Sequence, residues 1–238
     1  MTSNQPPFFS AIEVAIAADR LAGYRVATTD TSTDLIGRYL WNMALCEALY
    51  PSLQCLEVAM RNCIHNAATN MHGSSNWYEP RTQLLLPREA DAVARAQEEL
   101  RRNGKDPNDS GRVIAELHFG FWVSLFNAPY EQVLIHPTIK SVFPYLPTKQ
   151  RTRRLVLARL QIIRRLRNRV FHHEPIWKRA NLLAIHAEIC ETIGWMSPAM
   201  AELNALADHF VSQFHLGPSP NRLLVEKLAN RWQPPPKS

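Results

Sequence analysis

Cysteine and glycine are both scarce in this chain, and neither residue forms a recognised motif. The four cysteines (Cys46, Cys55, Cys63 and Cys190) include no Cys-x-x-Cys pair, so we expect buried reduced thiols in a reducing compartment and no zinc site. Only eight glycines are present, none of them in a glycine-rich phosphate loop, and runs that alternate apolar with polar residues are few. These absences favour helices over sheets.

Long hydrophobic runs are also missing. No stretch approaches the run of about 18 apolar residues that a membrane span requires, and the first residues lack the basic and apolar regions of a signal peptide. Apolar residues make up 46% of the chain and charged residues 20%, which is ordinary globular composition and enough for a sizeable core. The sequence therefore predicts a soluble cytoplasmic protein with no membrane partner.

Acidic residues are absent between Glu131 and Glu174, although the net charge of the whole chain is only +6. Ten basic residues occupy that segment, and such a field attracts a polyanion. The alternative is a solvated helix face whose charges pair with carboxylates elsewhere in the fold. The segment contains Lys140, Lys149, Arg151, Arg153, Arg154, Arg159, Arg164, Arg165, Arg167 and Arg169.

Amphipathic segments separated by proline, glycine and asparagine predict a single all-α domain over residues 1–216. A short helix and a proline-rich, flexible tail are expected over residues 217–238. In the long helix before Pro175 we expect an apolar stripe at Leu155, Ala158, Ile162, Leu166 and Val170. The expected helices cover residues 8–22, 34–50, 52–69, 88–102, 111–126 (the central core helix), 148–173, 181–193 and 198–215.

Residues 164–177 hold the densest set of groups suited to RNA chemistry. Arginine binds a phosphate through a rigid, permanently charged fork. Histidine both takes and gives a proton near neutrality. The segment combines Arg164, Arg165, Arg167 and Arg169 with Asn168, His172 and His173, and Pro175 follows as a helix stop. These are the groups needed to bind an RNA phosphodiester and cleave it without a metal or cofactor.

The spacing Arg167-Asn168-x-x-x-His172 resembles the R-x4-H signature of the HEPN superfamily. The stretch from Arg167 to Ile176, together with His186 and residues 193–198, is similar to the C-terminal half of its Abi-like (abortive infection) branch. Residues 56–65 and 111–122 are similar to upstream segments of that branch. The resemblance therefore covers about residues 52–198, with several segments in the same order.

This resemblance implies an all-α HEPN-like bundle with additional helices, which dimerises and acts as a metal-independent endoribonuclease in phage defence or as a toxin. The ribose 2′-hydroxyl would attack its own phosphate. His172 would then serve as general acid or base, and Arg167 would hold the phosphate and stabilise its developing charge. Asn168 would orient the phosphate or the imidazole. His173 would assist, contact nucleic acid or cap the helix.

Ideal helical geometry sets a condition on this pair. Asn168, His172 and Arg164 share one face at about 100° per residue, whereas Arg167 lies about 140° from His172. Arg167 and His172 can converge on one phosphate only if the helix loosens before Pro175 or if a second subunit supplies one of them. Loosening of the last helical turn would bring the two side chains of one subunit together, and a homodimer would bring together side chains of two subunits.

Other polar residues have both a structural and a functional interpretation. Glu57, Arg61, Asn62 and His65 follow one another on successive turns of a helix, where a Glu57–Arg61 ion pair is the structural reading and support of His172 is the functional one. Arg112 and Glu116 form a similar predicted pair. His118 and His186 are read as ordinary packed or surface histidines. RNA contacts are expected at Arg153, Arg154, Arg165 and Arg169.

One position departs from a related pattern. HEPN toxins that pair with a nucleotidyltransferase antitoxin tend to carry a tyrosine two positions after the histidine, as the site of modification. Glu174 stands there in this chain. An RNA or a different protein is therefore the expected antitoxin.

Two other functions are compatible with the same residues. The basic helix could bind RNA without cleaving it, with His172 held in place by packing. The chain could also be a helical scaffold that binds a protein partner through its basic face. Cleavage in EDTA separates the ribonuclease from both alternatives, and survival of a complex after RNA digestion would favour the scaffold.

Overall fold

The computed structural model describes residues 7–234, and over this range the chain is helical, with no β-strand. This confirms the predicted all-α class, while the HEPN-like arrangement of the helices stays a prediction. The chain forms two compact units. Unit 1 comprises the residues up to Tyr50, the segment Arg169–Leu182 and the residues from Asp208 onward, and unit 2 comprises Pro51–Asn168 and Leu183–Ala207. The single domain expected over residues 1–216 stays a prediction.

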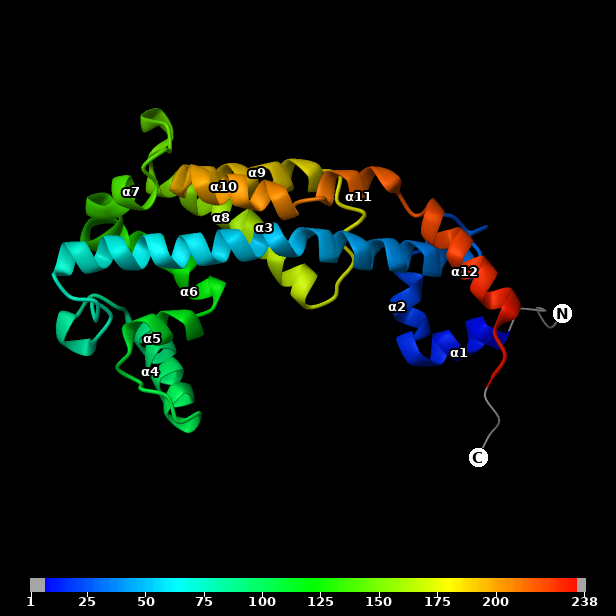
Figure 1. Cartoon of the computed structure of the whole chain (residues 1–238), viewed down its shortest axis with the longest axis horizontal. Helices are drawn as coiled ribbons and strands as arrows, with labels where there is room; N and C mark the ends of the chain where they lie inside the picture. The colour runs from blue at the N-terminus through cyan, green and yellow to red at the C-terminus, as the bar shows by residue number, and fades with distance from the viewer. Residues whose placement is uncertain (1–6, 235–238) are drawn as a thin grey trace. The chain divides into compact units, whose positions relative to one another are not determined.

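Figure 1 shows the helices in chain order. Short 3₁₀ or π segments (η1 Pro80–Thr82, η2 Ala128–Tyr130, η3 Glu131–Ile135 and η4 Thr148–Gln150) connect several of them. The α-helices are α1 Pro7–Ile16, α2 Ala18–Ala22, α3 Ser32–His72, α4 Pro87–Arg102, α5 Ser110–Glu116, α6 Phe119–Ser124, α7 His136–Val142, α8 Arg153–Phe171, α9 Leu182–Met196, α10 Pro198–Ala207, α11 Phe210–Leu216 and α12 Ser219–Arg231.

The prediction of two helices separated at Pro51 is wrong, because α3 runs through that residue as one helix of 41 residues. Proline fixes a φ angle close to the helical value, so its cost inside a helix is one lost hydrogen bond and a ring clash, about 3 kcal/mol. Burial of its neighbours offsets that cost: Leu49 and Ser52 are fully buried, and Leu53 is 4% exposed. Tertiary packing therefore overrides the local signal, and unit 2 begins at Pro51.

The expected central core helix over residues 111–126 is divided into α5 and α6. The chain is extended at Leu117 and His118, with ψ angles of 121° and 162°. The indole N–H of Trp122 donates to the carbonyl of Leu117 at 3.1 Å, which satisfies a group that the break leaves without a helical partner. The segment is nevertheless a core element, because Val113, Trp122 and most of its other apolar side chains are buried.

Helix α8 buries a different stripe from the predicted one. Leu155 is 36% exposed, whereas Val156 and Leu160, one residue and five residues later, are buried at 1% and 0%. Apolar residues in this helix fit more than one helical stripe, so the spacing of apolar residues alone did not show which stripe is buried. Leu166 and Val170 belong to both stripes. The buried positions are Val156, Leu160, Ile163, Leu166 and Val170.

Unit 1 has its own apolar cluster. Phe8 and Phe9 of α1, Leu21 of α2, Leu35 of α3 and Val225 of α12 are buried in it. The first expected helix is interrupted here, because Ala17 adopts a φ of 72° between α1 and α2.

The C-terminal helices differ from the prediction in one respect. Instead of one helix over residues 198–215, α10 ends at Ala207 and α11 begins at Phe210. Asp208 accepts a hydrogen bond from the backbone N–H of Phe210 at 3.0 Å, a turn that competes with the helix. The short last helix is confirmed as α12. Residues 235–238 of the expected flexible tail lie outside the described residues.

Among residues 7–234, no helix combines the length and apolar character needed to cross a bilayer.

His65 illustrates how unit 2 uses a buried polar group. Its Nδ1 accepts a hydrogen bond from the indole N–H of Trp77 at 3.1 Å, and both side chains are buried. An Nδ1 that accepts must be unprotonated, so the neutral imidazole is the form that fits. Burial lowers the pKa of His65 below its ordinary value of 6.5.

Protonation of His65 should weaken unit 2. Because the pKa is lower in the folded state, the unfolded chain takes up the proton first as the pH falls. As the pH falls, the free energy of unfolding should therefore begin to decrease near the pKa of histidine in the unfolded chain. It should stop decreasing once the pH is below the lower pKa of His65 in the folded protein. His65→Gln keeps an acceptor for Trp77 without the titration. Urea unfolding at about pH 7.5 and about pH 5.5 should show a smaller difference for His65→Gln than for wild type; an equal difference would contradict this assignment.

Candidate functional site

A cavity of about 260 Å³ in unit 2 gathers arginine side chains from two helices. Arg88 and Arg95 are seven residues apart on α4, so they share one face of that helix. Arg164 and Arg167 are three residues apart on α8 and are also neighbours on one face. We call this cavity the arginine pocket. Its polar lining includes Arg88, Arg95, Arg164, Arg167, Asn168 and His118.

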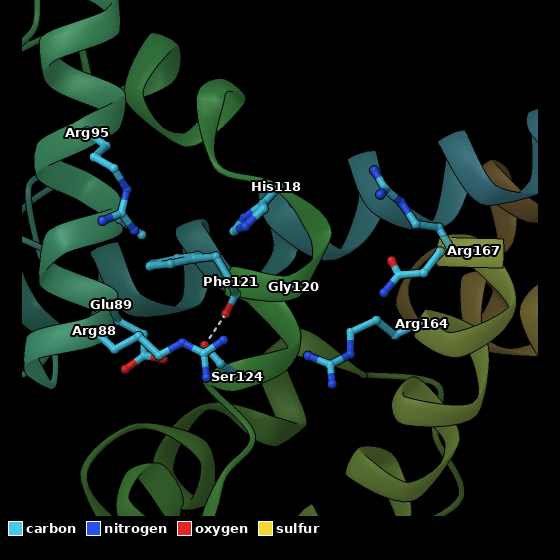
Figure 2. Close-up of a pocket in the computed structure, with 11 residues that line it drawn as sticks. Arg88, Glu89, Arg95, His118, Gly120, Phe121, Ser124, Arg164 and Arg167 are labelled. Atoms are coloured by element: carbon cyan, nitrogen blue, oxygen red, sulfur yellow. Dashed lines mark hydrogen bonds between the residues drawn. The ribbon is translucent and has the colours of Figure 1, made fainter. Parts of the chain in front are cut away.

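The guanidinium groups of Arg88 and Arg164 are directed at common space in this pocket, whereas that of Arg167 is turned toward Glu57 of α3. Figure 2 shows the ends of Arg88 and Arg164 pointing toward one another from opposite walls, with Arg95 on the same wall as Arg88. Within residues 7–234, no carboxylate forms an ion pair with Arg88, Arg95 or Arg164. Like charges held this way repel one another, so the arrangement is suited to an anion that lies between them.

The first turn of α4 is fixed by a buried hydrogen-bond chain. The hydroxyl of Tyr130 accepts the backbone N–H of Leu86 at 2.9 Å and donates to Glu89 Oε2 at 2.9 Å. Glu89 is only 5% exposed, although it lines the arginine pocket. Burial and the neighbouring Glu89 raise the pKa of Tyr130, so its hydroxyl keeps its proton. This chain of contacts positions Arg88, which lies between Leu86 and Glu89 in the same turn.

The break between α5 and α6 brings an imidazole to the pocket. His118 is the N-cap residue of α6, and its side chain makes no capping hydrogen bond. The side chain is exposed and lines the arginine pocket (Figure 2). From the sequence, His118 was expected to be an ordinary packed or surface histidine. The break that places His118 at the pocket is the one that Trp122 stabilises, and the sequence does not signal it.

Arg167 forms an ion pair with Glu57 of α3, with Nη2 and Oε2 separated by 3.6 Å. This replaces the predicted Glu57–Arg61 pair, which the described residues do not form, because the facing arginine of α8 takes its place. Both Arg167 and Glu57 have side chains that are 25% exposed. The predicted Arg112–Glu116 pair is also wrong: Arg112 pairs at 3.0 Å with Asp109, the N-cap residue of α5.

His172 and His173 lie at the C-terminal end of α8, in unit 1. The N–H of His173 donates to the carbonyl of Val170 at 3.1 Å, and the N–H of Glu174 donates to that of Arg169 at 2.8 Å. This pair of bonds is a Schellman motif in which His172 is the C-cap residue. His173 follows in the left-handed conformation, with a φ of 58°. The predicted end of the helix before Pro175 is confirmed.

The motif residues are therefore distributed between the units. Arg164, Arg167 and Asn168 belong to unit 2 and meet at the arginine pocket. His172 and His173 belong to unit 1 and are exposed there. In unit 1, His173 lines a separate hollow with Tyr24 and Asn42, and its carbonyl accepts a hydrogen bond from Arg20.

The predicted supporting residues of α3 occupy different environments. Asn62 is exposed, and His65 is buried against Trp77. Arg61 is partly exposed, and its Nε is buried without a hydrogen-bond partner among residues 7–234. Their roles at the site stay predictions.

The basic segment divides into paired and unpaired cations. Arg153 is 10% exposed, pairs with Glu131 at 3.0 Å and donates to the carbonyl of Phe126, so its guanidinium is engaged in the fold. Arg169 pairs with Glu174 at 3.4 Å. Arg154 and Arg165 are exposed and form no ion pair within the described residues. Arg154 and Arg165 are therefore available for the predicted RNA contacts, whereas Arg153 would first have to leave its partners in the fold.

Sequence reasoning missed Arg88, Arg95 and His118. The spacing of Arg88 and Arg95 is visible in the sequence of the expected helix over residues 88–102, but nothing in that spacing indicates a ligand. The face of α4 that carries these two arginines and helix α8 line the same cavity from segments about 70 residues apart, which no local pattern predicts.

Comparison with protein-family models, with curated proteins and with solved structures found no match.

Removing charge from the pocket should stabilise the protein. Arg164→Gln relieves repulsion and should raise the free energy of unfolding by about 0.5 kcal/mol at low salt. Arg159, on the same helix, pairs with Glu191 and lies 4.0 Å from the centre of the Trp195 ring. Arg159→Gln should therefore lower the free energy of unfolding by about 1 kcal/mol. Urea unfolding of the two variants tests the contrast, and a loss of stability in Arg164→Gln would show that Arg164 is a structural residue.

The left-handed conformation of His173 at the end of α8 leads to a separate prediction. His173→Gly should raise the free energy of unfolding by about 0.5–1 kcal/mol, since glycine adopts a positive φ without the steric cost of a Cβ atom. His173→Ala removes the imidazole but keeps that cost, so it is the matched control. Urea unfolding that finds the glycine variant no more stable than the alanine variant would contradict the assigned cap.

Proposed function

We propose that this chain is a metal-independent endoribonuclease of the HEPN type. The observation that supports the proposal is the arginine pocket, in which Arg167 and Asn168 share a cavity with the unpaired guanidinium groups of Arg88 and Arg164. Guanidinium groups bind phosphate oxygens through paired, charge-assisted hydrogen bonds. RNA is the partner that fits such groups together with the R-x4-H motif.

In this proposal, Arg167 holds the phosphate next to the scissile bond and Asn168 orients it. The ribose 2′-oxygen loses its proton to a base and attacks the phosphorus, the bond to the 5′-oxygen breaks, and an acid returns a proton to that oxygen. A 2′,3′-cyclic phosphate and a 5′-hydroxyl result. His172 is the proposed general acid or base, a role taken from the family resemblance.

A non-catalytic RNA-binding protein is the second candidate. The observation in its favour is that the arginine pocket and the exposed Arg154 and Arg165 offer phosphate contacts that require no proton transfer. Binding would then weaken steeply with salt, and no cleavage product would form.

The biological setting follows from the same resemblance. We propose that cleavage acts in abortive infection or as a toxin, that the chain is a homodimer, and that an RNA or a protein restrains it. Expression of wild type should then slow the growth of its host.

Cleavage in excess EDTA tests the proposal. Purified wild type should cut single-stranded RNA and leave cyclic phosphate ends. His172→Ala should lose about 10²-fold or more of this activity, as expected for removal of a general acid or base. Arg167→Ala should lose activity through loss of charge stabilisation, which typically costs about 10²–10³ in rate.

The control is His136→Ala, because His136 is an exposed histidine of α7 that does not line the arginine pocket. It should cleave as wild type does. Binding without any cleavage by wild type would replace the ribonuclease with the second candidate, and equal cleavage by wild type and His172→Ala would remove His172 from the mechanism.

A further inference from the structure

The arginine pocket carries more positive charge than one internal phosphodiester neutralises. Its lining holds four arginines and one carboxylate, that of Glu89. Glu57 pairs with Arg167 from outside the lining and reduces the excess to two positive charges. An internal phosphodiester carries a single negative charge. A phosphate monoester carries about −1.5 to −2 at pH 7 and offers three terminal oxygens.

The dimensions of the pocket also favour a chain end. Its volume of about 260 Å³ is below the roughly 300–1,000 Å³ of cavities that take drug-sized ligands. A terminal phosphate with part of its ribose fits such a space, and the rest of an RNA chain would lie outside it. The guanidinium groups of Arg88 and Arg164 face one another from two walls, so they can contact different oxygens of one phosphate (Figure 2).

The two groups with the clearest role are Arg88 and Arg164. Arg95 and His118 also border a neighbouring hollow that Glu99 and Glu116 line, so carboxylates are available to Arg95 on that side. Arg88 is placed by the turn that Tyr130 fixes, and Arg164 by the buried neighbours Ile163 and Leu166 on α8. Both are held on helices rather than on loops, which gives a binding site its precision.

We propose that the arginine pocket binds a terminal phosphate monoester of RNA, with Arg88 and Arg164 as its two principal ligands. This inference rests on the proposed function for the identity of the polymer. It adds a substrate class: RNA with a phosphorylated end is bound in preference to the same RNA with hydroxyl ends. Both 5′- and 3′-phosphates offer this chemistry, and the experiment distinguishes them.

The test uses short 2′-O-methyl oligonucleotides, which lack the attacking hydroxyl and cannot be cleaved by the proposed route. Three versions of one sequence carry a 5′-phosphate, a 3′-phosphate or hydroxyl ends only. One phosphorylated version should bind wild type about tenfold more tightly than the hydroxyl version, the effect of one further charge-assisted contact. Arg88→Gln and Arg164→Gln should each abolish this preference while they still bind the hydroxyl version.

The matched control is Arg102→Gln, because Arg102 lies on α4 and pairs with Glu98 at the surface. It should keep the preference. Equal affinity of wild type for all three versions would overturn the inference and leave the ribonuclease proposal intact. Binding of inorganic pyrophosphate that depends on Arg88, without binding of any oligonucleotide, would support a phosphate pocket and overturn the proposed RNA function.

Discussion

The proposed function depends on the unpaired guanidinium groups of Arg88 and Arg164, which share one pocket of unit 2. Arg88 and Arg164 face common space without a carboxylate partner among the described residues, and Arg167, which also lines the pocket, pairs with Glu57 at 3.6 Å. Such an arrangement costs free energy in the empty protein and gains it when an anion is bound. A surface selected only for stability would place carboxylates there, as it does for Arg153 and Arg159. The proposed phosphate site rests on the unpaired guanidinium groups of Arg88 and Arg164.

The scaffold keeps these charges in place through ordinary packing. The hydroxyl of Tyr130 joins Leu86 to the buried Glu89 and so fixes the first turn of α4. The Trp122 indole stabilises the break that brings His118 to the pocket. Binding of phosphate and transfer of protons are separate tasks in RNA cleavage. In the proposed function, the arginine pocket of unit 2 serves the first task, and His172 is proposed for the second on the R-x4-H resemblance.

The sequence predicted the ends of helices correctly where neighbouring residues determine them. Asn103-Gly104 ends α4, and Pro175 is preceded by the end of α8, because caps and prolines act on adjacent backbone groups. Pro51 was misread because burial of Leu49 and Leu53 outweighs the proline penalty. The site was predicted in part: Arg164, Arg167 and Asn168 come from one helix and do share a pocket. The roles of Arg88 and Arg95 could not be predicted, because two helices that are distant in the sequence line the same pocket.

The most direct test of phosphate binding by the arginine pocket is the salt dependence of RNA affinity. Plots of the logarithm of the association constant against that of salt concentration should be compared for wild type and the double variant Arg88→Gln/Arg164→Gln, with a 2′-O-methyl oligonucleotide as ligand. Each phosphate contact to a single strand contributes a slope of about −0.7. The account predicts a shallower slope for the double variant, by about 0.7 or more. Coincident lines for the two proteins would contradict it.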